Sequence, residues 1–418
     1  MENSSQDQRS LGVAVVGVAG AVATTTAAGL ALLQQGAIDH MGLPLSFLSD
    51  ESVDSSIEGL PPYESIVCQG WDFRSSSLLD AARDHGILEE EEMKAASDTL
   101  AATHPWSGVA VSSSSVQRSG LSSGDHAFRG SHRQAVQKVR EDLREFQDGS
   151  NLDDLVVVNL ASTTPNHDLI TDGHSGSLTS IEDFEESLDA DDPQIQSSML
   201  YAYASIQEDI PFVNFTPNLS VAIPPLVRLA ESQGVPIAGR DGKTGQTFLK
   251  TLLAPGFEMR NLRVDGWYST NILGNNDGAS LRDEHSRSSK IKSKRGVLEE
   301  ILGYSVEDHI VDIRYYPPRG DAKEAWDNID ISGFMGRQMQ IKINFLCRDS
   351  ILAAPLVIEL VRLMCLAHRT GEAGIQHQFG TFFKSPISGP SDPVPTHALH
   401  KQERFLHGWL DRVLKPST

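Results

Sequence analysis

The sequence predicts an α/β protein in which a parallel-sheet domain is interrupted by an inserted α+β domain. Residues 13–17 (VAVVG) and 155–160 (LVVVNL) are unbroken apolar runs rich in β-branched side chains. Such runs are typical of parallel strands buried on both faces. Residues 338–345 (QMQIKINF) instead alternate apolar and polar side chains, as a half-exposed strand of a second sheet does. A chain of 418 residues has room for two or three such domains.

The first strand is followed by a glycine turn over 17–23 (GVAGAVA) and by a helix expected from Thr24 onward. The spacing Gly17-x-x-Gly20-x-x-Ala23 matches the start of a dinucleotide-binding fold. Small residues let the backbone approach a pyrophosphate, whose charge then lies at the positive end of the helix. A plain strand–turn–helix core would show the same pattern.

The same patterns predict the elements that complete the parallel-sheet domain. We expect a strand and a loop over 211–221, a helix over 224–234 and a strand over 235–239. The small polar residues 161–164 (ASTT) follow the 155–160 strand, and open α/β sheets bind ligands at the carboxyl ends of their strands. In the inserted domain we expect strands over 262–267, 309–315 and 338–345. After that domain we expect an apolar helix over 350–367 with Asp349 near its start as a cap.

The composition restricts the class of function. The formal net charge of −21 argues against nucleic acid as the main partner, because the phosphate backbone would be repelled. Three cysteines without a CxxC or CxxH pair argue against a disulfide scaffold or a zinc ribbon and are compatible with a reducing compartment. His397 and His400 form an HxxH without a further ligand at conventional spacing. We therefore expect a cytoplasmic protein without a metal site.

Residues 11–33 are apolar and uncharged over a length that could span a bilayer. The residues before them carry two acids and one arginine rather than the positive region of a signal peptide. Three threonines, 24–26, and several small residues also dilute the hydrophobicity. A buried strand followed by a helix explains the segment better than membrane insertion does.

Basic residues are concentrated in one place on this acidic chain. Residues 282–295 (RDEHSRSSKIKSKR) carry six cationic side chains, which favours the binding of a specific anion, although a solvated surface cluster would look the same. Single lysines also lie beside turns, at Lys243, Lys323 and Lys384. Lys384 lies between two phenylalanines and a proline, and partial desolvation would lower its pKa.

Seven motifs in order resemble those of the myo-inositol-1-phosphate synthases. They are GWDF (70–73), DGKTGQT (241–247), GNNDG (274–278), the lysine run 290–294, GDAK (320–323), CRDSILAAP (347–355) and FFKSP (382–386). The resemblance covers nearly the whole chain and is strongest between about 210 and 386. It implies a Rossmann-type domain that binds NAD tightly. It also implies the conversion of D-glucose 6-phosphate into 1D-myo-inositol 3-phosphate by internal oxidation, enolisation, aldol closure and reduction.

The same resemblance implies roles for individual residues. Lys290 and Lys294 would lie on the phosphate and on developing oxyanions, Lys323 would be a second oxyanion lysine, and Lys384 would move the proton of the C5 hydroxyl. Asp241 and Asp349 would orient these lysines, and Asp277 matches the aspartate of the family's GNNDG motif. The residues expected to contact NAD are Gly17, Gly20, Ala23, Thr24, Asp72, Ser162, Thr163, Thr244 and Asp349.

Two other functions use the same features. A related NAD-dependent dehydrogenase or a cyclase acting on another sugar phosphate would share the fold, and residues 214–220 (NFTPNLS) shorten a family motif. A non-catalytic NAD-binding regulator is disfavoured because it would have no reason to keep all four lysines. The resemblance also implies an NAD-binding domain of 1–245 plus 350–418, an inserted catalytic domain of 246–349, and a homotetramer formed through the inserted sheet.

Overall fold

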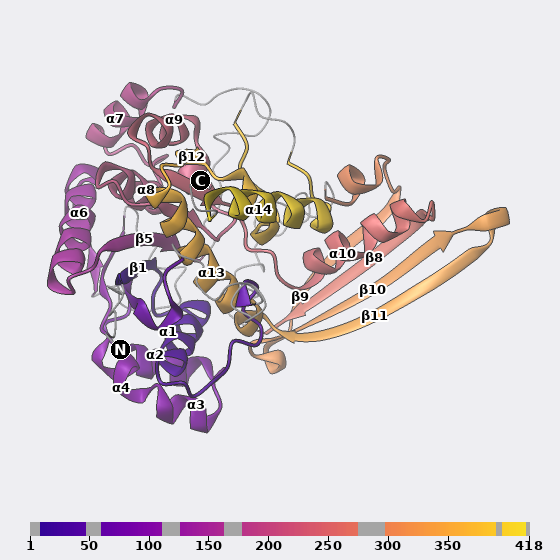
Figure 1. Cartoon of the computed structure of the whole chain (residues 1–418), viewed down its shortest axis with the longest axis horizontal. Coiled ribbons are helices and arrows are strands. Elements are labelled where there is room, and N and C mark those ends of the chain that lie inside the picture. The colour runs from indigo at the N-terminus through magenta and orange to yellow at the C-terminus, as the bar shows by residue number, and fades with distance from the viewer. Residues whose placement is uncertain are drawn as a thin grey trace, which may run out of the picture. The chain divides into compact units, whose positions relative to one another are not determined.

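The computed structural model describes residues 9–46, 60–110, 126–162, 178–274, 297–389 and 395–414. It divides into two compact units, which contain different parts of the chain (Figure 1). The first comprises 1–162, 166–240 and 354–376, and the second comprises 163–165, 241–353 and 377–418. Residues 377–418 thus pack with the second unit, whereas the sequence led us to place them with the first. The assignment of cofactor binding and catalysis to separate domains stays a prediction.

The first unit is built on a parallel sheet of eight strands, as the apolar runs predicted. Their spatial order is β12-β7-β6-β5-β1-β2-β3-β4. The strands are β1 (Leu11–Val16), β2 (Ile66–Asp72), β3 (Trp106–Val109), β4 (Ala127–Phe128), β5 (Asp154–Asn159), β6 (Phe212–Asn214), β7 (Pro236–Gly239) and β12 (Gly374–Ile375). The direction of winding reverses between β1 and β5, which pair along their whole lengths. The α/β fold class is confirmed.

Helices cover this sheet in two groups. One group is α1 (Ala21–Gln34), which packs against α2 (Leu78–His85), α3 (Glu90–Ala95) and α4 (Ser97–Ala102). The other comprises α6 (His132–Gly149), α7 (Ile181–Asp189), α8 (Ser197–Gln207) and α9 (Pro224–Gln233). Helix α1 begins at Ala21, three residues before the predicted start at Thr24. Alanine is the strongest helix former, so Ala21 and Ala23 extend the helix into the expected turn. Two short 3-10 helices, η2 (Tyr63–Ser65) and η3 (Ser220–Ala222), complete the unit.

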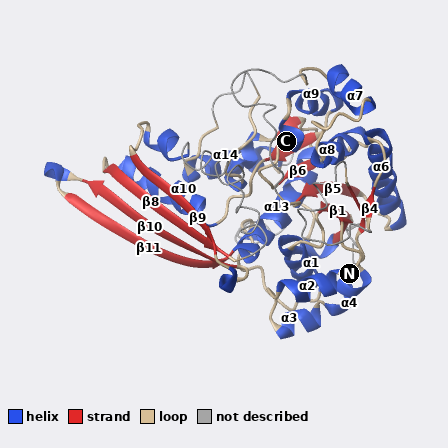
Figure 2. Ribbon diagram, turned by 180° about the vertical axis from the view of Figure 1, so that it is seen from behind, coloured by secondary structure: helices blue, strands red, loops and turns tan. Residues whose placement is uncertain are grey.

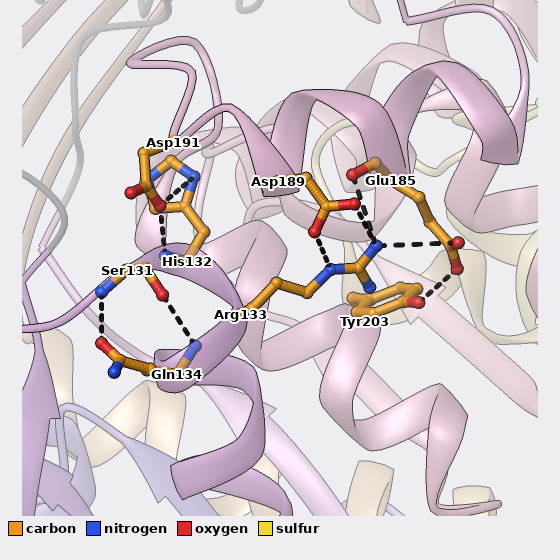
Figure 3. A network of polar contacts seen from close by, with 8 residues as sticks. All are labelled: Ser131, His132, Arg133, Gln134, Glu185, Asp189, Asp191 and Tyr203. Atoms are coloured by element: carbon orange, nitrogen blue, oxygen red, sulfur yellow. Dashed lines mark hydrogen bonds and ion pairs between the residues drawn. The ribbon is translucent and has the colours of Figure 1, made fainter.

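Arg133 joins three helices of the second group (Figure 3). Its guanidinium, on α6, forms ion pairs with Asp189 and Glu185 of α7. Glu185 in turn accepts a 2.6 Å hydrogen bond from the hydroxyl of Tyr203 on α8. Ser131 and Gln134, on either side of Arg133 in the sequence, form a reciprocal capping box at the start of α6. These contacts fix the helices relative to one another with charge-assisted bonds.

Helix α13 (Asp349–Arg369) is long and apolar enough to cross a membrane, and it is the one such helix among the described residues. Most of it is buried inside the protein, as expected for a core helix. It carries the buried pair Glu359 and Arg362, 2.7 Å apart. Glu359 accepts hydrogen bonds from the backbone N–H of Leu45 and from the hydroxyl of Tyr63, and Arg362 donates to the carbonyl of Pro61. The buried pair therefore anchors the chain on both sides of 47–59.

The second unit contains a mixed sheet of four long strands in the order β11-β10-β8-β9 (Figure 2). These are β8 (Arg263–Leu273), β9 (Asp308–Tyr315), β10 (Ala322–Ser332) and β11 (Gln338–Arg348). Helix α10 (Gly245–Met259) and the helical residues 297–302 cover one face, on a core that includes Trp267 and Ile329. The alternation predicted for 338–345 is confirmed, because every second residue of β11 over 340–346 is exposed. The unit also contains α14 (Leu399–Val413) and the 3-10 helices η4 (Pro317–Arg319), η5 (Phe334–Gly336) and η6 (His377–Phe382).

Candidate active site

In the first unit, the predicted glycine turn lies where the sheet reverses its winding. Gly17 follows β1 with φ of +87°, and a Cβ added there would lie 3.1 Å from backbone atoms of Ala161, which follows β5. Glycine is therefore required both by its left-handed backbone and by the close approach of the neighbouring loop. Ser162 is exposed beside it. The structure thus brings together two of the segments predicted to contact a nucleotide, at the position where open α/β sheets bind one.

The start of α1 fits a pyrophosphate. Its N-cap is Gly20, no side chain caps it, and its first turn contains no acidic residue. The first-turn N–H groups are therefore not capped by a side chain or met by an acidic residue of the helix itself. Thr24 is buried, and its hydroxyl donates to the carbonyl of Gly20. Thr24 therefore helps to shape the turn. Contacts of Thr24 and of the buried Ala23 with NAD stay predictions.

Asp72, at the end of β2, holds the glycine turn in place. One carboxylate oxygen accepts from the N–H of Ala19 at 3.1 Å and the other from the N–H of Arg74 at 3.0 Å. Burial raises the pKa of Asp72, and the backbone hydrogen bonds oppose this shift. Gly70 in the same motif lets β2 lie against β1, because a Cβ there would lie 2.0 Å from the carbonyl oxygen of Val15.

Sequence reasoning missed a buried chain of polar groups at the ends of β5 and β6. Asn159 donates to Asn214 at 3.1 Å and to Thr216 at 3.2 Å. Asn214 donates to the carbonyl of Asn218, and Asn218 donates to that of Ser162. The loop after β6 is thus tied to the loop after β5. The signal that could have revealed this chain is an asparagine at the end of an apolar run, as in VVVN and FVN. A buried side-chain amide must form hydrogen bonds, so such an asparagine indicates polar partners nearby.

In the second unit, the loop 241–245 runs alongside residues 382–384. The N–H of Lys243 donates to the carbonyl of Phe382 at 2.8 Å, and the N–H of Lys384 donates to that of Asp241 at 2.6 Å. The ammonium of Lys384 also lies 3.0 Å from a carboxylate oxygen of Asp241. Asp241 has φ of +62°, a conformation that is uncommon for a residue with a side chain and is held here by these bonds.

A second lysine–aspartate pair lies in the same unit. The ammonium of Lys323, on β10, lies 3.2 Å from Oδ1 of Asp349 at the start of α13. The same oxygen accepts from the hydroxyl of Thr244 at 2.9 Å. Burial disfavours the charged form of Asp349, but attraction to Lys323 and to Lys384 outweighs it and lowers the pKa of Asp349 to about 2. The loop 241–245 carries both Asp241, the partner of Lys384, and Thr244, which bonds to Asp349. The two lysine–aspartate pairs therefore form one cluster around this loop. The side chain predicted as a helix cap is committed to this cluster.

Lys323 also lies close to the start of α10. A Cβ added at Gly245, the first residue of that helix, would lie 3.6 Å from its Nζ. No side chain caps α10, because the hydroxyl of its N-cap Thr244 is directed to Asp349. Positive charge from the lysine and from the helix dipole therefore coincides at this point, where it meets the carboxylate of Asp349.

Four of the predicted residues cannot be placed. Thr163, Asp277, Lys290 and Lys294 lie outside the described residues, and their roles stay predictions. Among the described residues there is no group of three or more His, Cys, Asp or Glu side chains that could hold a metal ion. His397 instead lies 3.3 Å from Glu300, and burial lowers its pKa to about 4.

Comparison with known proteins identifies relatives over nearly the whole chain. The family model described as Myo-inositol-1-phosphate synthase matches residues 53–411. An inositol-3-phosphate synthase 1 from Bacteroides thetaiotaomicron is 39% identical, over 97% of this chain and 95% of its own length. An inositol-3-phosphate synthase 1 from Oryza sativa is 31% identical, over 82% of this chain and 70% of its own length.

Solved structures show the same fold. The crystal structure of inositol-3-phosphate synthase from Caenorhabditis elegans has a TM-score of 0.85 and 23% identity, and the match covers 98% of this chain and 87% of that one. A myo-inositol-1-phosphate synthase-related protein from Thermotoga maritima has a TM-score of 0.75 and 24% identity, covering 98% of this chain and 100% of that one. The family model and the curated relatives match across both compact units. The chain belongs to the myo-inositol-1-phosphate synthase family.

Proposed function

We propose that this chain is an inositol-3-phosphate synthase, which converts D-glucose 6-phosphate into 1D-myo-inositol 3-phosphate with NAD as a bound cofactor. The observation that carries the proposal is the cluster formed by Lys323–Asp349 and Lys384–Asp241, because the loop 241–245 contacts Lys384 through Asp241 and Asp349 through Thr244. A sugar phosphate that passes through oxyanions requires fixed positive charge of this kind. Family membership and 39% identity to a curated synthase support it.

A bound NAD would supply reversible hydride transfer, so that the overall reaction would be redox-neutral. The start of α1 would hold its pyrophosphate, since its first turn contains no acidic residue and no side chain caps it. The small residues of the turn 17–20 would let the pyrophosphate approach. Asp72 would act by holding that turn through Ala19. Contacts from Ser162, Thr244 and Asp349 to the cofactor are part of the same proposal.

The lysines supply the remaining chemistry. Lys384 would hold and move the proton of the C5 hydroxyl, with Asp241 orienting its ammonium. Lys323, oriented by Asp349, would neutralise the oxyanion that develops when the neighbouring carbon loses its proton. The dianionic phosphate would be met by Lys290 and Lys294, with Asp277 in the same segment.

We also propose that the protein is a cytoplasmic homotetramer assembled through the four-stranded sheet. The face of that sheet opposite Trp267 exposes Tyr268, Ile310, Trp326 and Leu346. Large apolar side chains gathered on one face are typical of an interface between subunits. Analytical ultracentrifugation of wild type and of Trp326→Glu tests this, with a smaller species expected for the variant and an unchanged distribution arguing against the face.

Product analysis tests the function. Pure protein is incubated with glucose 6-phosphate and with NAD at a concentration far below that of the sugar, and the phosphate ester formed is identified by ³¹P and ¹³C NMR. We expect inositol phosphate in large molar excess over NAD, with no accumulation of NADH. Product formed only in proportion to NAD would instead identify a dehydrogenase, and an unchanged sugar would refute the proposal.

A further inference from the structure

Lys243 belongs to the loop that carries Asp241 and Thr244, yet its side chain lies inside the protein. It is 4% exposed, and its ammonium donates a 2.6 Å hydrogen bond to Oε1 of Gln402 on α14. Burial lowers the pKa of Lys243 to about 7, and attraction to Glu300 opposes this shift only in part. A buried ammonium is costly, so its presence calls for an explanation beyond packing.

The acceptor of Lys243 is held in one orientation. The side-chain amide nitrogen of Gln402 donates to the carbonyl of Thr396 at 2.7 Å and to that of Gly380 at 3.1 Å. With its nitrogen committed to two carbonyls, the amide presents its oxygen to Lys243. Gln402 is itself buried.

Gln402 therefore contacts both segments that meet at Asp241–Lys384. Through Lys243 it holds the loop 241–245, and through Gly380 it holds η6, which leads to Lys384. The edge-on contact of Phe379 with Trp409, whose ring centroids lie 5.2 Å apart, fixes η6 on α14 a second time.

The remaining charges near Lys243 come from two elements. Glu300, from the helical residues 297–302, attracts the ammonium, and His397, just before α14, lies 3.3 Å from Glu300. Lys401 of α14 also acts on Glu300. In this arrangement Gln402 is the side-chain acceptor that locates the ammonium of Lys243.

We propose that Lys243 and Gln402 are positioning residues of the active site, which together set the loop 241–245 so that Asp241 meets Lys384 and Thr244 meets Asp349. This inference rests on the proposed function. In the proposed reaction neither Lys243 nor Gln402 touches the reacting atoms. They act by fixing the direction from which Asp241 and Thr244 approach their partners, and small misplacements of such groups reduce turnover strongly.

Lys243→Met keeps the length of the side chain and removes the hydrogen bond to Gln402. We expect kcat with glucose 6-phosphate to fall about 10- to 100-fold, while KM changes less than about threefold because the phosphate-binding groups are untouched. Gln402→Met should act in the same direction. The double variant should be no worse than the poorer single variant, because both remove one interaction.

Lys250→Met is the matched control. Lys250 is also fully buried in the second unit, but its ammonium contacts His309 and lies over the ring of Trp267. We expect this variant to keep kcat within about threefold. An equal fall in kcat for Lys250→Met would show that loss of any buried lysine in this unit is sufficient, and would overturn the inference.

Hydrogen exchange measured without sugar or NAD gives a readout that does not depend on activity. Peptides covering 241–247 and 380–386 should exchange faster in Lys243→Met and in Gln402→Met than in wild type, with the first unit unchanged. Unchanged exchange in folded variants, or full kcat, would refute the positioning role. If Lys243→Met does not fold, Gln402→Met decides the question by the same measurements. A wild-type protein without product would refute the proposed function, and the exchange data would still test the placement of the loop.

Discussion

Asp241 and Lys384 are joined twice, by a 3.0 Å contact between their side chains and by a 2.6 Å hydrogen bond from the N–H of Lys384 to the carbonyl of Asp241. The backbone bond fixes the separation of the two residues whether or not the side chains interact. A change to either side chain can therefore remove chemistry while leaving the loop in place. Mutation at this pair is consequently a clean test of a catalytic role.

We predict that Lys384→Ala lowers kcat with glucose 6-phosphate about 10³-fold, because a positioned proton-transfer group contributes on that order. Asp241→Asn should lower kcat less, since it leaves the lysine in place but no longer orients it by charge. Product formation measured by NMR provides the check. Lys401→Ala, an exposed lysine on α14, is the control and should match wild type. Normal turnover by the Lys384→Ala variant would refute the proton-transfer role of Lys384.

We predict that Asp349→Asn lowers both turnover and the stability of the folded protein above about pH 4. The pKa of Asp349 lies at about 2, below its ordinary value, despite the opposing effect of burial. A carboxylate whose pKa is lower in the folded state than in the unfolded state stabilises the folded protein above its ordinary pKa. This stabilisation is lost as the pH falls through the pKa that the group has in the folded state. The gap in unfolding free energy between wild type and variant should thus be about 2 kcal/mol above pH 4 and shrink toward pH 2. Urea unfolding at several pH values measures it, and a gap independent of pH would contradict the prediction.

We predict that Lys250 makes the stability of the second unit depend on alkaline pH. Burial lowers the pKa of Lys250 to about 8, with attraction to Asp327 opposing the shift. Between about pH 8 and the ordinary lysine pKa the unfolded chain binds a proton that the folded protein does not, so this residue makes stability rise with pH. Lys250→Met should lack that rise, which amounts to about 3 kcal/mol. Parallel slopes for the two proteins across this range would show that the lysine keeps its proton.

We predict opposite outcomes for alanine at two glycines. In Gly70→Ala the new Cβ would lie 2.0 Å from the carbonyl oxygen of Val15, so β1 and β2 must separate and stability should fall by more than about 3 kcal/mol. Gly29→Ala, inside α1, meets no atom within 4 Å and should stabilise by up to about 1 kcal/mol. Melting temperatures compare them, and a tolerated Gly70→Ala would mean that the strand pairing is looser than described.

The fold could be predicted from local patterns, because buried parallel strands are apolar without interruption and half-exposed strands alternate. The structure has a strand at each of three predicted places, which are 13–17, 155–160 and 338–345. The start of α1 was misplaced because helix propensity and turn propensity compete in small residues such as Ala21. Residues 377–418 belong to the second compact unit. No local pattern indicates this, because packing between distant segments leaves no local signal.

The candidate site depended on the family resemblance. Asp241 and Lys384 are 143 positions apart, and nothing in either local sequence names the other as its partner. The motifs supplied the four residues but not their pairing, and the structure places Asp241 beside Lys384 and Asp349 beside Lys323. Gln402 carried no signal at all, because a single glutamine on an amphipathic helix is normally a surface residue. Its importance is visible only once its amide is seen between Lys243 and Gly380.

The contacts of Leu45, Pro61 and Tyr63 with the Glu359–Arg362 pair join residues that are about 300 positions apart in the chain. Contacts between such distant residues carry a loop-closure cost and form slowly during folding. The first unit can therefore complete this part of its core only after α13 has been synthesised.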